Sequence, residues 1–136
     1  IGVGVAVDAS ESDIAYCFSE VKGYSKFGTY TGNGDADGTF VYTGFKPAWL
    51  IIKKTSGTGN WRLYDNKRLG YNGANYNLQP NSSGVEETAE HVDLLSNGFK
   101  LKTTGGGENA SGETYIYMAF AESPFVNSNG IPNNAR

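Results

Sequence analysis

The sequence predicts an all-β domain, an antiparallel β-sandwich with long loops rich in glycine, asparagine and tyrosine. Its 136 residues include nineteen glycines, nine tyrosines and seven phenylalanines but one methionine, a composition typical of β-proteins with many tight turns. Several short stretches alternate apolar and polar residues, as half-buried strands do. The densest apolar run, residues 48–52, is rich in β-branched and aromatic side chains and is too short for a membrane-spanning helix.

We expect the fold to be built on two strands, residues 39–43 and 48–52. Pro47 between them has no amide hydrogen to donate to a sheet, so it marks the entrance of the second strand. We expect that second strand to be central in a sheet and buried on both faces. The residues predicted to be almost fully buried are Phe18, Trp49, Leu50, Ile51, Ile52, Ile116 and Phe120.

Shorter strands and polar turns are predicted on either side of this pair. Before it come residues 14–20, which alternate cleanly, and residues 21–31, which are interrupted at Gly23. After it come residues 61–65, 92–95, 99–103 and 114–121, the middle two forming a hairpin around Asn97-Gly98. Residues 66–90 show no period and are predicted to form a long surface excursion.

Residues 8–20 are echoed by residues 109–122, and this echo suggests a domain-sized repeat. On this interpretation residues 1–22 are the closing strand or strands of a preceding module, packed on the same domain or on a neighbour. Residues 23–126 are then a complete β-sandwich module, and residues 127–136 are an extended C-terminal tail. Chance similarity of two amphipathic strands is the alternative. The chain begins at Ile1 rather than methionine, so we expect a fragment or a processed product.

Charge and cysteine content exclude several classes of function. A net charge of −3 and a pI near 5.1 argue against binding to nucleic acid or to an anionic membrane, and no apolar run is long enough for membrane insertion. The single cysteine, Cys17, excludes an internal disulfide and a thiolate zinc site. Because free cysteine usually behaves as a small buried hydrophobe, we expect Cys17 to pack in the core.

No pattern in the sequence predicts a catalytic residue, a metal site or a cofactor. Residues 33–38 resemble the start of a calcium loop, but the twelfth position is Gly44 where a glutamate is needed, so we predict a turn. His91 lies near Asp93 without a nucleophile motif. Glu86, Glu87 and Glu90 have the chemistry of a glycosidase pair, but their clustering in a polar loop favours a solvated acidic loop.

The strongest functional signal is an aromatic, amide-rich segment after residue 60. Aromatic rings stack on the apolar faces of sugars, polar side chains bond the hydroxyls, and the same residues make protein-recognition surfaces. The alternative is that the aromatics only fasten the loop to the sandwich. The candidate ligand or assembly residues are Trp61, Tyr64, Asp65, Arg68, Tyr71, Asn72, Tyr76 and Asn77.

Several motifs resemble one known family. They are YCFSEV at residues 16–21, GYSKFG at 23–28, YTGNG at 30–34, FVYTGF at 40–45, PAW at 47–49, LSNGFK at 95–100 and YMAFAE at 117–122. From about residue 14 to Arg136 the chain resembles the C-terminal repeat modules of large tail and tail-fibre-like proteins of marine bacterial and cyanobacterial phages. That family has no defined function. The resemblance implies a component of the virion, an extracellular particle, and it transfers no catalytic or binding residue.

We therefore expect a structural and adhesive module of a phage tail or tail-fibre-like protein, not an enzyme. Its expected partners are other copies of itself or other virion proteins, with host-surface polysaccharide as a further candidate. One alternative is a self-assembling filament or decoration subunit. Another is a module that degrades polysaccharide.

Overall fold

The chain folds into two antiparallel sheets. The computed structural model describes residues 16–68, 72–73, 76–88 and 91–122, and its strands lie within these ranges. The larger sheet contains β1 (Ser25–Thr31), β3 (Trp49–Lys54), β4 (Arg62–Asp65), β5 (Tyr76–Leu78), β6 (Glu87–Thr88) and β9 (Thr114–Phe120). The smaller sheet contains β2 (Phe40–Tyr42), β7 (Val92–Leu95) and β8 (Gly98–Leu101). Within the described ranges no helix is long and apolar enough to cross a membrane.

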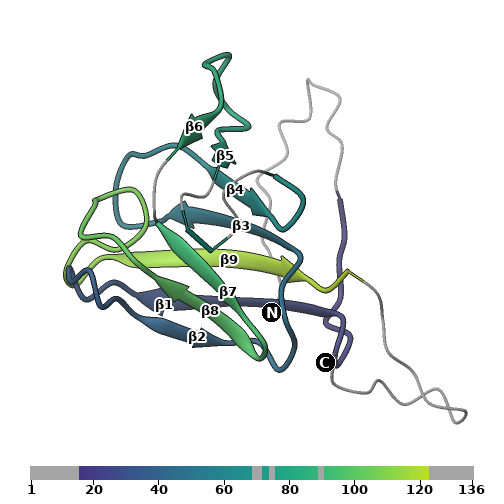
Figure 1. Ribbon diagram of the computed structural model, residues 1–136. Helices are drawn as coiled ribbons and strands as arrows, with labels where there is room; N and C mark the ends of the chain where they lie inside the picture. Colours follow the sequence, from purple (N-terminus) through teal and green to yellow (C-terminus); the bar gives the residue numbers. More distant parts are fainter. Residues whose placement is uncertain (1–15, 69–71, 74–75, 89–90, 123–136) are drawn as a thin grey trace, which may run out of the picture.

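The two sheets are the layers of a sandwich. The strand order is β1-β9-β3-β4-β5-β6 in the larger sheet and β2-β8-β7 in the smaller one. Figure 1 shows the smaller sheet lying across β1, β9 and β3, while β5 and β6 extend beyond it. The predicted all-β sandwich is therefore confirmed, and one face of the larger sheet has no second layer of strands among the described residues.

Strand β3 is central, as the apolar run predicts. It pairs with β9 on one side and β4 on the other, and the amide of Ala48 donates to the carbonyl oxygen of Phe120 at 2.8 Å as the strand begins. The proline turn does not join neighbours in one sheet, however. It carries the chain from β2 in the smaller sheet to β3 in the larger one.

The core lies between the two sheets. Leu50 and Ile52 of β3 point into it and have no exposed surface. The ring of Phe99 on β8 contacts Tyr117 on β9 at 5.2 Å and Tyr30 on β1 at 6.0 Å, both edge-on. These aromatic contacts join the two sheets, and the other buried side chains fill the rest of the space between them.

The prediction that β3 is buried on both faces was wrong. Trp49 and Ile51 point away from the smaller sheet and are half-buried, as is Phe120. Ile116 is 37% exposed and Phe18 is 59% exposed. Successive strand residues point to opposite faces, and within the described ranges only one face of the larger sheet carries a second sheet, so a continuous apolar run is not buried throughout.

The N-terminal segment also differs from its prediction. Residues 14 and 15 lie outside the described part of the chain, and residues 16–20 form no strand and are exposed. Cys17 is exposed rather than packed in the core. Phe18 of this segment packs against the sheet without pairing in it, since its ring contacts those of Phe27 and Phe120, while Tyr16 is 79% exposed.

This difference bears on the echo between the two ends of the chain. Residues 114–120 form β9, which pairs on both sides, whereas residues 16–20 pair with no strand, so the echoed segments do not share an environment. The division of the chain into modules stays a prediction. The tail predicted for residues 127–136 lies outside the described residues.

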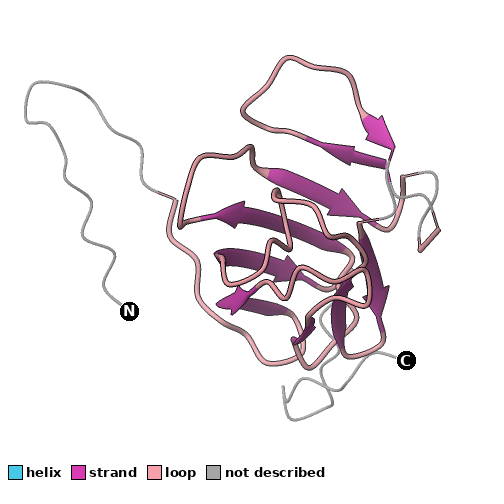
Figure 2. Cartoon of the chain, turned by 90° about the vertical axis from the view of Figure 1, so that its left-hand side faces the viewer, coloured by secondary structure: helices cyan, strands magenta, loops and turns pink. Residues whose placement is uncertain are grey.

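The predicted hairpin is confirmed as β7 and β8, with Leu95 paired to Gly98 across the turn. The excursion predicted for residues 66–90 contains two short strands that its sequence did not reveal. Figure 2 shows β5 and β6 with the loop between them at one end of the larger sheet. Both strands have only two or three residues, which is too short to show a period.

Candidate functional site

The uncovered face of the larger sheet carries a continuous row of apolar side chains. In the strand register Phe27 lies beside Met118, Met118 beside Ile51, Ile51 beside Leu63 and Leu63 beside Leu78. Paired residues of antiparallel strands point to the same side of a sheet, so these five form one line, which we call the outer row. All five are half-buried. Strands lie about 4.8 Å apart, so the row extends over roughly 19 Å.

An aromatic cluster lies beside the outer row at the end of the sheet where β1 begins. Phe120 is at its centre, with its ring 5.6 Å from Trp49, 5.7 Å from Phe27 and 6.0 Å from Phe18, each edge-on. Phe18 comes from the segment that precedes β1, and it therefore covers one end of the uncovered face. The rest of the described N-terminal segment is exposed.

Polar side chains border this apolar surface. The neighbouring register line on one side places Thr29 and Lys53 beside Ile116, and the line on the other side places Asp65 beside Trp49 of the aromatic cluster. An apolar centre with a polar rim is the usual anatomy of a protein–protein interface. The face can therefore bury apolar area against a partner while its edge stays hydrated.

Two of the residues predicted as a ligand or assembly surface lie inside the protein. The Tyr64 ring is 1% exposed and Asn77 is fully buried. The Tyr64 hydroxyl donates to Glu108 Oε1 at 2.8 Å, and Asn77 Oδ1 accepts from Arg62 Nη1 at 3.2 Å. Both face the interior because their strand positions share one register line with Leu50.

Other residues of that prediction make hydrogen bonds within the described parts of the segment between β4 and β5. The carboxylate of Asp65 accepts from the backbone amide of Arg68 at 2.9 Å and from its Nε at 2.7 Å, while the Arg68 guanidinium also pairs with Glu86. Asn72 adopts a positive φ of 51° and exchanges hydrogen bonds of 2.7 and 2.9 Å with the backbone of Leu94.

The last three of the eight predicted residues are Trp61, Tyr71 and Tyr76. Trp61 is half-buried, and its backbone amide donates to Asn81 Oδ1 at 2.9 Å. Tyr76 is half-buried on β5, and Tyr71 lies outside the described residues. The structure thus places the seven described residues at interior, hydrogen-bonded loop and half-buried positions rather than gathering them on one surface. That any of them contacts a ligand stays a prediction.

The loop that precedes β9 carries a buried carboxylate. Glu108 is 1% exposed, and its Oε1 lies 2.8 Å from the Tyr64 hydroxyl, 3.1 Å from His91 Nδ1 and 3.3 Å from Arg62 Nε. Burial raises the pKa of Tyr64 well above its ordinary value, and the charge of Glu108 raises it further. A buried charge needs such partners, and in this protein they tie the loop to β4.

The acidic residues considered for glycosidase chemistry are occupied by ion pairs where the structure describes them. Glu86 pairs with Arg68, and Glu87 pairs with Arg62. Glu90 lies outside the described residues. Residues 33–38 form the predicted turn, in which Asp35 Oδ1 accepts from the Asp37 amide at 2.8 Å. In the described ranges no three histidine, cysteine or acidic side chains are grouped as a metal site would require.

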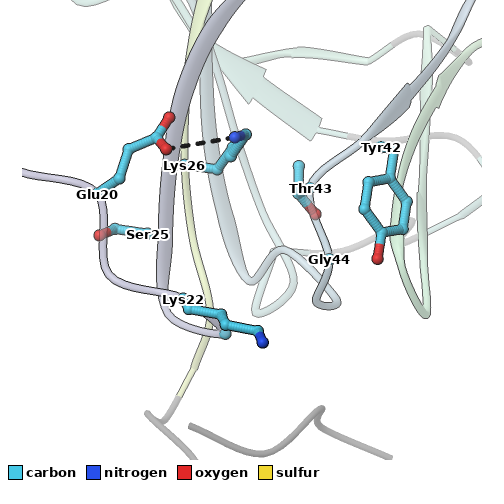
Figure 3. A pocket seen from close by; sticks show the side chains of 8 residues that line it. Glu20, Lys22, Ser25, Lys26, Tyr42, Thr43 and Gly44 are labelled. Atoms are coloured by element: carbon cyan, nitrogen blue, oxygen red, sulfur yellow. Dashed lines mark hydrogen bonds and ion pairs between the residues drawn. The ribbon is translucent and has the colours of Figure 1, made fainter.

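A pocket of about 600 Å³ lies at the edge of the sandwich formed by β1 and β2, which are the edge strands of their sheets. Two short segments line it, as Figure 3 shows. One is the turn before β1 and the first residues of that strand, and the other is the turn after β2. The lining residues are Glu20, Lys22, Gly23, Ser25, Lys26, Tyr42, Thr43 and Gly44.

The comparisons with known proteins identify a family but add no function. A family described as a domain of unknown function, DUF7483, matches residues 1–124. The chain belongs to this family. The match begins at residue 1, so the family includes the segment that carries Phe18 as well as the sandwich. Searches of curated proteins and of solved structures found no match.

Sequence reasoning missed both the outer row and the pocket. A signal for the outer row was present, because residues 114–120 are apolar or aromatic at nearly every position and so offer two apolar faces. For the pocket no signal was present. Residues 20–26 and 42–44 are ordinary turn and strand-end sequences, and only the fold brings these two segments together.

Proposed function

We propose that this chain is a structural and adhesive module of a virion, in a protein of the phage tail or tail-fibre-like class, and that it assembles with other copies through the outer row. The virion class comes from the resemblance of its motifs. The observation that carries the assembly role is the apolar row across five strands with polar residues at its rim.

The contiguity and the polar border of the apolar surface favour an interaction role. Single exposed apolar residues are normal on a protein, but a contiguous apolar patch rimmed by polar residues marks an interaction surface. The outer row and the aromatic cluster are contiguous, since Phe27 belongs to both. Covering them with a neighbour stabilises the assembly in proportion to the apolar area removed from water.

A second copy of the chain is the partner that this face fits best. Virion modules are present in many copies, and repeated contacts between identical chains build symmetric particles or filaments. The net charge of −3 is small, so repulsion between copies does not prevent contact. The alternative function, a self-assembling filament or decoration subunit, would use the same interface but would have no adhesive role.

Substitution at the centre of the outer row tests the proposal. Met118 pairs with both β1 and β3, so Met118→Lys places a charge in the middle of the proposed interface. Val85→Lys is the matched control, because Val85 is 89% exposed and lies in the loop between β5 and β6. Sedimentation equilibrium over a wide range of concentrations should show association of the wild type and of Val85→Lys.

Met118→Lys should remain monomeric with a melting curve that shows cooperative unfolding. Equal association of Met118→Lys and the wild type would refute the role of the outer row. A wild type that stays monomeric at every concentration would refute assembly through this face.

A further inference from the structure

Strand β1 presents the longest open edge of the two sheets. The edge strands are β1 and β6 in the larger sheet and β2 and β7 in the smaller one (Figure 1). A free edge is a template for a further strand, and proteins protect it by keeping the strand short or by covering its backbone groups. Strands β6 and β2 have two and three residues, and Asn72 covers the backbone of Leu94 at the edge of β7. Strand β1 has seven residues.

Alternate residues of β1 direct their backbone groups to this open edge. The carbonyl oxygen of Tyr24 accepts from the amide of Ala121 at 2.7 Å, in register with the pairing of β1 and β9. At the other end the amide of Gly32 donates to the carbonyl oxygen of Glu113 at 2.9 Å. Even-numbered residues of β1 therefore bond to the β9 side, and odd-numbered residues face the open edge.

Side chains cap the two ends of this edge and leave its centre free. The carboxylate of Glu20 accepts from the amide of Phe27 at 3.2 Å, and the hydroxyl of Thr39 donates to the carbonyl oxygen of Thr31 at 2.9 Å. Between these caps lie the carbonyl of Phe27, the amide and carbonyl of Thr29 and the amide of Thr31. These groups have no hydrogen-bond partner in the described part of the chain, and Thr29 and Thr31 are exposed.

The free groups are self-complementary about a two-fold axis at Thr29. When β1 of a second copy runs antiparallel with the two Thr29 residues opposite each other, each Thr29 amide donates to the carbonyl oxygen of the other Thr29. Each Thr31 amide then donates to the Phe27 carbonyl oxygen of the other copy. A slip of two residues in either direction would leave half of these groups unpaired, so the caps select one register.

The side chains along the edge permit this contact. Residues 27–31 contain neither a charge nor a proline, which are common devices for protecting an edge. The pairing places Thr29 beside Thr29 and Phe27 beside Thr31 of the other copy, and threonine pairs and pairs of aromatic with β-branched residues are favourable neighbours across strands. The caps are side chains that turn aside without moving the backbone, so they do not block a partner strand.

We propose that β1 pairs with β1 of a second copy across this edge, so that two of the larger sheets become one continuous sheet. A contact of this two-fold kind closes at a pair of copies. It lies in the plane of the sheet, whereas the outer row lies on the face of the sheet. Two different contacts on one chain let an assembly extend beyond a pair. The inference thus goes beyond the proposed function and stands without it.

Cysteine cross-linking of the intact chain tests the register. In a Cys17→Ser background, which removes an exposed native thiol, Thr29→Cys places two thiols across the two-fold axis. Their Cα atoms would lie about 5.5 Å apart, within the reach of a disulfide. Thr31→Cys is the matched control, because Thr31 is exposed on the same face of β1 but would lie about 13 Å from its counterpart.

In a glutathione redox buffer, non-reducing electrophoresis should show the Thr29→Cys dimer forming at least about tenfold faster than the Thr31→Cys dimer. Equal rates for the two variants, or faster linking of Thr31→Cys, would overturn the edge pairing.

Met118→Lys separates the edge contact from the outer row. The edge contact alone is transient, because the net gain from a few hydrogen bonds does not exceed the cost of association. Met118→Lys is therefore still expected to sediment as a monomer, while a disulfide traps the transient pair. Loss of the preference for Thr29→Cys when Met118→Lys is added would overturn the edge pairing. A wild type that sediments as a monomer but keeps this preference would refute the outer-row contact and support the edge contact.

Discussion

The two faces of strand β3 should respond differently to the same chemical change. Leu50 and Ile51 are neighbours and isomers, so replacing either by alanine removes the same number of carbon atoms. Leu50 has no exposed surface, whereas Ile51 is half-buried in the outer row. At about 0.8 kcal/mol for each buried carbon, the lost transfer free energy is about 2.4 kcal/mol at Leu50 and smaller at Ile51, whose side chain is partly exposed.

A cavity penalty applies only at the enclosed position. Leu50→Ala should therefore lower the free energy of unfolding by about 2–5 kcal/mol, and Ile51→Ala by about 1–2 kcal/mol. Urea unfolding monitored by fluorescence, at a protein concentration low enough to keep the chain monomeric, measures both values. Equal losses for the two variants, or a larger loss for Ile51→Ala, would refute the assignment of a covered and an uncovered face.

The remaining predictions concern close packing, pH and the loop after β4. Gly98→Ala should be strongly destabilising, because an added Cβ would lie 2.1 Å from a backbone oxygen of β2, whereas Gly106→Ala, with no atom within 4 Å, should melt like the wild type. The pKa of Tyr64 is raised in the folded protein, so its contribution to stability is complete below the unfolded pKa of 10.0 and is lost as the pH rises above that value. Melting temperatures measured at increasing pH test this. Removing Tyr71 and Tyr76 together should leave the melt nearly unchanged and weaken adsorption or assembly.

Each of these predictions has a contrary result. Equal melting temperatures for the two glycine variants would contradict the packing of β8 against β2. A Tyr64→Phe variant with the same loss of stability above pH 10.0 as the wild type would show that other groups cause it. An unfolded Tyr71/Tyr76 double variant would show that these rings belong to the core, and unchanged adsorption and assembly would leave the loop without a role.

The sequence predicts the strands well where apolar and polar residues alternate or where a turn is marked. The hairpin of β7 and β8, the central strand β3 and the last strand β9 are all at their expected places. What sequence could not predict is which face of each strand is covered. The covered face depends on how the three-stranded sheet lies against the six-stranded sheet, and no local sequence pattern encodes this.

The candidate site was harder to predict because its residues are distant in the chain. An alternating strand does not tell which of its side chains point inward, so composition alone places Tyr64 and Asn77 with surface residues although both are buried. The pocket requires the turn before β1 to meet the turn after β2, and the outer row requires the register of five strands. Both arise from tertiary structure, beyond the reach of composition and periodicity.

A high-resolution structure of the assembled native particle tests the central claim most directly. The account predicts that side chains of the outer row, Met118 and Ile51 above all, lie within about 4.5 Å of side chains of a neighbouring copy. A particle in which the outer row faces solvent, or in which it is covered by residues 1–15 of the same chain, would contradict it.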